Sequence, residues 1–169
     1  MKRLISMICF LPLFTSAQRI KTSIDKLTGD TIIYTTYEEI GSKFSTAFSY
    51  FLTKEKKLNY LTLQVRLSEY LPKVEKGSEL NFRLANGQII ALYATHTFES
   101  KPDVFYSETP IDLHNFSLSP RYQLDENAIN QLKSSPVVLI RFHYDATYKD
   151  YEIEPTQSSK FLKEMQLIY

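Results

Sequence analysis

The feature that most restricts the fold of this chain is a regular alternation of apolar and polar side chains over residues 43–67. Successive side chains of a strand point to opposite faces, so a period of two predicts half-buried strands. The charged segment 54–57 (KEKK) between the two runs predicts a solvated turn, and the whole stretch predicts an antiparallel hairpin with one face on the core. The inward face would carry Phe44, Thr46, Phe48, Tyr50, Leu52, Leu61, Leu63, Val65 and Leu67, and the outward face of the second strand Tyr60, Thr62, Gln64 and Arg66.

A second hairpin is predicted over residues 79–97. Leu80, Phe82 and Leu84 alternate in its first strand, and Asn86-Gly87 separates them from the apolar run that starts at residue 89. Asn-Gly favours a tight hairpin turn because both residues tolerate positive φ.

Weaker strand signals cover four further segments. Residues 31–38 and 148–154 are predicted as strands, residues 116–123 as a strand confined to a sheet edge by Pro120, and the apolar run 137–144 as a central strand buried on both faces. Residues 18–30 are polar and give no strand signal. The irregular stretch 99–115 predicts a functional loop or a short strand near residues 104–106.

Two helix signals follow residue 124. Asp125 is suited to cap a short helix that ends near Lys133, with Leu124 and Ile129 in the positions of a hydrophobic staple. Pro155 introduces a terminal helix whose apolar residues recur at helical spacing. The order of elements predicts an α+β fold: a mostly antiparallel sheet, as a sandwich or open barrel, with two short helices near the C-terminus.

The N-terminus predicts export. Two basic residues, an apolar run over residues 4–14 and the small residues Thr15-Ser16-Ala17 have the form of a cleavable signal peptide covering residues 1–17. Met7 and Ile8 before Cys9 do not fit a lipoprotein signal. Cleavage after Ala17 removes this cysteine, the only one in the chain, and leaves residues 18–169 as a single β-rich domain without disulfides. We expect it in the periplasm or secreted.

Charge argues against nucleic acid as a partner, and hydropathy argues against a transmembrane segment in the mature chain. Loss of Lys2 and Arg3 from 20 basic residues leaves 18 against 19 acidic ones, a formal net charge of −1. A nucleic-acid-binding domain would be clearly basic, and no later apolar run is long enough to predict a transmembrane segment.

Several segments resemble an uncharacterised family of small exported bacterial proteins. They are residues 25–30 (DKLTGD), residues 76–80 (KGSEL) leading into the Asn-Gly hairpin, and the late order of helix, Ile140-Arg141 strand and terminal helix with Phe161-Leu162. The resemblance implies a β-rich periplasmic or surface domain, and it implies no activity.

Sequence patterns of catalytic and metal sites are weak. His96, His114 and His143 lack the close spacing that preorganises zinc ligands on one element. The acidic residues of segment 145–154 lack the spacing and central glycine of a calcium loop, and no Gly-x-Ser-x-Gly elbow occurs. We therefore predict no metal and no cofactor.

A binding surface is the better-supported prediction. Outward Tyr60, with Tyr34 and Tyr37 on an earlier strand, offers aromatic contact area, although cross-strand pairs that only stabilise the sheet explain the same residues. The stretch 99–115 adds Phe105, Tyr106 and His114, because loops on rigid sheets commonly carry recognition. The predicted surface comprises Tyr60, Phe105, Tyr106 and His114.

Three functions remain open at this point. The leading one is a non-enzymatic exported module that binds an envelope protein or a small ligand. The second is an exported hydrolase of unrecognised type that uses residues in segment 96–145. The third, a structural subunit of an envelope assembly, predicts an apolar patch or an open sheet edge that awaits another strand.

Overall fold

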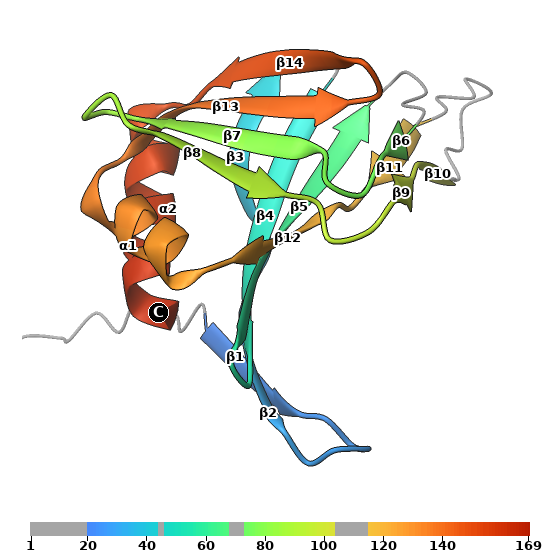
Figure 1. Ribbon diagram of the computed structural model, residues 1–169, viewed down its shortest axis with the longest axis vertical. Helices are drawn as coiled ribbons and strands as arrows, with labels where there is room; N and C mark the ends of the chain where they lie inside the picture. The colour runs from blue at the N-terminus through green and yellow to red at the C-terminus, as the bar shows by residue number, and fades with distance from the viewer. Residues whose placement is uncertain (1–19, 44–45, 68–72, 104–114) are drawn as a thin grey trace, which may run out of the picture.

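The structure, a computed structural model, describes residues 20–43, 46–67, 73–103 and 115–169, which form two large antiparallel sheets, a two-stranded ribbon and two helices (Figure 1). The larger sheet has the order β1-β2-β4-β5-β11-β10, with β3 also paired to β4 and β12 to β5. Its strands are β1 (Ile20–Ile24), β2 (Thr31–Thr35), β3 (Glu38–Lys43), β4 (Thr46–Glu55), β5 (Leu58–Leu67), β10 (Lys101–Asp103), β11 (Asn115–Leu118) and β12 (Arg121–Leu124).

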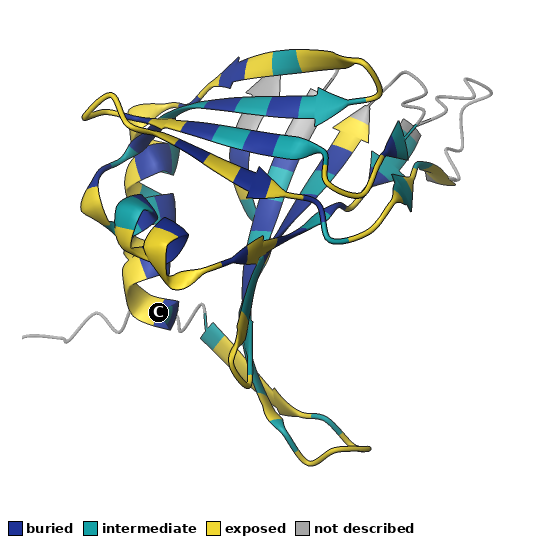
Figure 2. Ribbon diagram, in the orientation of Figure 1, coloured by how far each residue is buried: buried dark blue, intermediate teal, exposed yellow. Residues whose placement is uncertain are grey.

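The smaller sheet lies across the inner face of the larger one and has the order β14-β13-β7-β8. Its strands are β7 (Glu79–Leu84), β8 (Ile89–Tyr93), β13 (Val137–Tyr144) and β14 (Thr147–Glu152), and β6 (Lys73–Val74) with β9 (Phe98–Glu99) forms the ribbon. The ring of Phe48 on β4 joins the sheets, because its centroid lies 5.9 Å from that of Phe142 and 4.0 Å from that of Tyr151. Figure 2 shows the buried residues along these facing surfaces.

The helices α1 (Glu126–Ser134) and α2 (Pro155–Ile168) close one end of the two sheets (Figure 1). Phe161 of α2 packs against both layers: its ring centroid lies 4.9 Å from that of Tyr50 on β4 and 5.9 Å from that of Phe82 on β7. The buried Tyr50 hydroxyl donates to Glu164 Oε2 at 2.8 Å. In the part of the chain that the structure describes, no helix is long and apolar enough to cross a membrane.

The predicted fold class is confirmed: the protein is α+β with antiparallel sheets, and the described strands do not close into a barrel. Residues 46–67 form the expected hairpin of β4 and β5. Its turn is shorter than predicted, because Lys54 and Glu55 belong to β4 and only residues 56 and 57 turn, with Lys56 at φ 54°. The capped helix and the helix after Pro155 are confirmed as well, although α2 is a full 14 residues.

Four strand predictions were wrong in detail. The predicted strand 31–38 is two strands, β2 and β3, which pair with different halves of the ten-residue β4. Residues 116–123 are likewise split by Ser119-Pro120 into β11 and β12, which both pair with β5. β11 lies between β5 and β10, whereas β12 pairs with β5 alone among the described strands and so has the predicted edge position. β13 is central, but only Val137, Ile140 and Phe142 are buried and its other residues are half-buried, so the strand is not buried on both faces. β1 was not predicted at all, since four of its five residues are exposed and no apolar period exists to reveal it.

The second hairpin is confirmed with a different turn. Leu84 N–H donates to Gln88 O and Gly87 N–H to Leu84 O, so three residues, 85–87, form the loop. Gly87 has φ 85°, whereas Asn86 does not take positive φ. This is a type I turn followed by a glycine bulge, which is the usual three-residue hairpin. The strand considered near residues 104–106 lies outside the described residues.

Candidate functional site

The outer face of the larger sheet, the face turned away from the smaller sheet, collects two rows of cross-strand neighbours. The register aligns Tyr34 with Thr53, Thr53 with Tyr60, and Tyr60 with Gln123. The adjacent row aligns Phe51 with Thr62 and Thr62 with Arg121. Residues paired directly across antiparallel strands share a face, so segments far apart in the sequence present their side chains together.

Arg121 belongs to β12 and lies beside Tyr60 and Thr62 of β5 on this face. Its guanidinium carbon sits 3.6 Å from the ring centroid of Tyr60, a cation–π contact. Its Nη2 is 3.7 Å from Glu55 Oε2, which is an ion pair longer than a hydrogen bond. The Arg121 Nε is buried and has no hydrogen-bond partner among the described residues. A guanidinium has five N–H donors, and the contacts here leave donors free to bind an anion.

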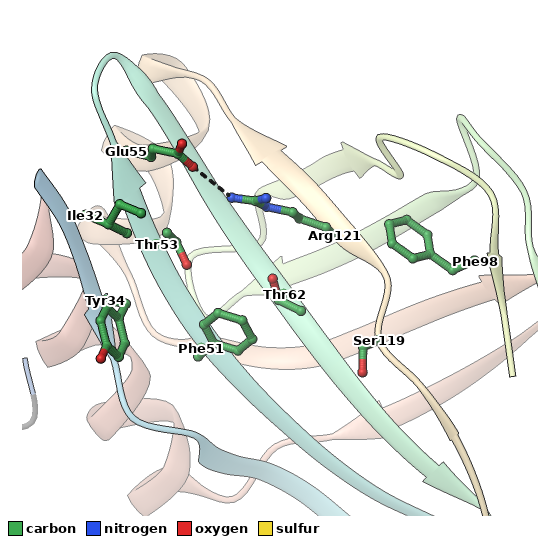
Figure 3. A pocket seen from close by; sticks show the side chains of 9 residues that line it. All are labelled: Ile32, Tyr34, Phe51, Thr53, Glu55, Thr62, Phe98, Ser119 and Arg121. Atoms are coloured by element: carbon green, nitrogen blue, oxygen red, sulfur yellow. Dashed lines mark ion pairs between the residues drawn. The ribbon is translucent and has the colours of Figure 1, made fainter. Parts of the chain in front are cut away.

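A shallow hollow of about 440 Å³ lies beside this arginine (Figure 3). Figure 3 shows Arg121 extended across Thr62 toward Glu55, with Tyr34 and Phe51 on one side and Phe98 on the other. The hollow thus combines aromatic walls, a cation and small hydroxyls. Its lining residues are Ile32, Tyr34, Phe51, Thr53, Glu55, Thr62, Phe98, Ser119 and Arg121.

The backbone under the hollow is held by the last residue of the chain. The Tyr169 hydroxyl donates to the carbonyl oxygens of Thr53 and Tyr60, at 3.1 and 3.2 Å. Burial raises the pKa of the Tyr169 phenol, so it stays a neutral donor at physiological pH. Thr53 and Thr62 lie on the outer face and are each only 7% exposed. The floor of the hollow is therefore fixed, while its rim is open.

The groups that line the hollow are suited to binding an anion with an apolar body. Hydrolysis by a hydroxyl nucleophile needs a base within hydrogen-bond reach. Within the described ranges, no hydroxyl of the hollow is hydrogen-bonded to a histidine or a carboxylate. An arginine beside aromatic walls instead offers bidentate hydrogen bonds to an anion and apolar contact for the body attached to it.

Among the described residues, the histidines and acids considered from the sequence do not assemble into a metal site, and His114 lies outside these residues. His96 is exposed and pairs its Nδ1 with Thr95 Oγ1 at 2.9 Å, whereas His143 Nε2 lies 3.2 Å from Asn81 Nδ2 on the smaller sheet. Asp150 forms a bidentate pair with Arg141, both contacts at 2.7 Å, which lowers the pKa of the Asp150 carboxyl. Over residues 20–43, 46–67, 73–103 and 115–169, no three His, Cys, Asp or Glu side chains are grouped to hold a metal ion.

The aromatic surface predicted from the sequence is only partly assembled. Tyr60 lies on the outer face under Arg121, Tyr34 lines the hollow, and Tyr37 packs edge-on against Phe51 with ring centroids 4.7 Å apart. Phe105, Tyr106 and His114 lie outside the described residues. Sequence reasoning missed Arg121, because nothing local to residues 116–124 shows that β12 pairs beside Tyr60.

Comparison with known proteins gives no relative: no family model matches the chain, and no match is found among curated proteins or solved structures. The candidate site therefore rests on its own geometry.

Proposed function

We propose that this protein is an exported, non-enzymatic binding module whose outer-sheet hollow takes a small ligand with a carboxylate or similar anionic group on an apolar body. The observation that carries the proposal is Arg121, a cation stacked on Tyr60 with a buried and unbonded Nε at the edge of an aromatic hollow. The Arg121 side chain is 37% exposed and its contact to Glu55 is longer than a hydrogen bond, so its terminal N–H groups are available to an anion in the hollow.

Export is the second part of the proposal and rests on the sequence. The basic, apolar and small-residue regions of residues 1–17 have the order of a signal peptide. The resemblance of residues 25–30 and 76–80 to small exported bacterial proteins agrees with this origin. An exported module would meet its ligand in the periplasm or outside the cell.

The binding proposal is tested with matched probes that differ in charge. Phenylacetate and its neutral amide, phenylacetamide, are titrated into the protein while amide and side-chain NMR shifts are followed. We expect phenylacetate to shift resonances of Phe51, Thr62 and Arg121, and to bind about tenfold more tightly than the amide, a difference of about 1.4 kcal/mol.

Two arginine variants supply the control. Arg121→Gln should weaken phenylacetate binding about tenfold, whereas Arg141→Gln, on the smaller sheet, should leave it unchanged. Circular dichroism checks that both variants are folded. Equal binding of acid and amide, or full binding by Arg121→Gln, would contradict the proposal.

A further inference from the structure

β1 forms one end of the larger sheet, and among the described residues no strand pairs with its second side. Four of its five residues are exposed, and the Ile24 side chain is 68% exposed. Figure 2 shows the strand on the hairpin that projects from the body of the protein. The unpaired N–H and C=O groups of such an edge are a template for another strand, so β1 offers a place for the sheet to continue.

The hydrogen bonds of the hairpin show which backbone groups of β1 face outward. Asp25 N–H donates to Asp30 O at 2.8 Å, beside the turn. Hydrogen bonding to one neighbour alternates along an antiparallel strand. The odd-numbered residues of β1 therefore bond to β2, as Asp25 bonds to Asp30, and the backbone groups of residues 20, 22 and 24 point away from β2.

These outward groups are complementary to the same groups of an identical strand. When two copies of β1 lie antiparallel about a twofold axis at Thr22, residue 22 pairs with residue 22 and residue 20 pairs with residue 24 of the second copy. Each outward N–H then meets an outward C=O, as a twofold contact between identical surfaces requires. A shift by one residue would place outward groups opposite inward ones, so the strand specifies its own register.

The side chains fit the same register. Ile20 and Ile24 of the second copy lie opposite each other, on the face that carries Ile33, which packs against the core. On the other face Lys21 lies opposite Ser23 of the second copy, so no two like charges are directly opposed. Apolar pairs across strands stabilise a sheet, whereas directly opposed like charges destabilise it.

We propose that two copies of this protein associate through β1, antiparallel about Thr22, and join their larger sheets into one. The occupant of the edge is a second copy because β1 is complementary to itself in both backbone and side chains. A pair of five-residue strands is a small interface, so we expect a weak dimer with a dissociation constant of about 1 μM to 1 mM. No residue of β1 lines the hollow beside Arg121, so the dimer does not depend on a ligand there.

The test begins with the backbone at the twofold axis. Protein is purified after expression of the full sequence, so that its N-terminus is the one the cell produces, and sedimentation measures its mass across this concentration range. Thr22→Pro removes an N–H that β2 does not use, so the hairpin should still fold, yet the dimer should weaken about tenfold or more. Thr22→Val keeps the N–H and should dimerise like the parent, and circular dichroism checks that both variants are folded.

The register is tested by charge at residue 23. Ser23→Glu places a carboxylate opposite Lys21 of the second copy, twice in each dimer, and should tighten the dimer about threefold or more. Ser23→Lys places two like charges there and should weaken it to a similar extent. Thr147→Glu, the same change of charge at an exposed position of β14, should leave the dimer unchanged.

Four results would overturn the proposal. They are a monomer at every concentration up to about 1 mM, a dimer that Thr22→Pro leaves intact, shifts in the same direction for Ser23→Glu and Ser23→Lys, and hydrogen exchange at the amides of residues 20, 22 and 24 that does not slow as the protein is concentrated. The last result, in a protein that does dimerise, would place the interface elsewhere.

Discussion

Two buried tyrosine hydroxyls in this protein have opposite surroundings. The Tyr169 hydroxyl donates to Thr53 and Tyr60 carbonyls, whereas the Tyr122 hydroxyl is buried in the core without a hydrogen-bond partner among the described residues. Burial raises the pKa of the Tyr122 phenol as well, so the group stays neutral and its unmet hydrogen bond is its main cost. Removing the hydroxyl group should therefore change the stability of the protein in opposite directions at Tyr122 and Tyr169.

Removal of each hydroxyl tests this directly. Tyr122→Phe should leave the free energy of unfolding unchanged or raise it by about 1 kcal/mol, because it deletes an unsatisfied polar group. Tyr169→Phe should lower it by about 1 kcal/mol through the loss of two carbonyl contacts. Urea unfolding of both variants beside the parent measures the difference, and a loss of stability in Tyr122→Phe would show that its hydroxyl has a partner.

At the scale of elements, the β1–β2 hairpin is held by turn chemistry more than by burial. The Asp25 carboxylate accepts from the amides of Leu27 and Thr28 at 2.8 and 2.9 Å, and these bonds lower the pKa of Asp25. Asp30 at the other end of the turn pairs with Lys56 at 2.7 Å, which ties the turn to the β4–β5 hairpin. The hairpin projects from the body with exposed side chains on both faces (Figure 2), and Leu27 at its turn is 94% exposed.

The start of α1 offers a clear element-scale prediction. Asp125 caps the helix through its 2.7 Å bond to the Ala128 amide. Asp125→Ala should lower the free energy of unfolding by about 1 kcal/mol, because a free N–H group remains at the helix start. Asp125→Asn keeps a cap and should cost much less. Urea denaturation compares the two, and equal losses would mean that the residue acts through its charge alone.

For the whole molecule, Phe161 joins helix α2 to both sheets. It contacts Tyr50 in one sheet and Phe82 in the other, and it is fully buried. Phe161→Ala should cost about 3–5 kcal/mol, since truncation leaves a cavity between helix and sheets. Leu167→Ala, on the same helix but 64% exposed, should change stability by less than about 0.5 kcal/mol. Unfolding in two separate steps for Phe161→Ala would show that the sheets are not one cooperative unit.

The sequence alone determined the parts of this protein that local chemistry specifies. Period-two alternation identified β4 and β5 and put Tyr60 on the outward face, the turn at Gly87 identified the second hairpin, and Asp125 identified the start of α1. Each of these signals acts within a few residues, through side-chain direction, positive φ or a cap.

The tertiary structure alone decided which distant segments meet. Exposed β1 has no apolar period, the break after Thr35 depends on how β2 and β3 share β4, and Arg121 reaches Tyr60 only because β12 pairs with β5. Pairing between distant strands depends on packing of the whole core, and a local pattern does not encode it.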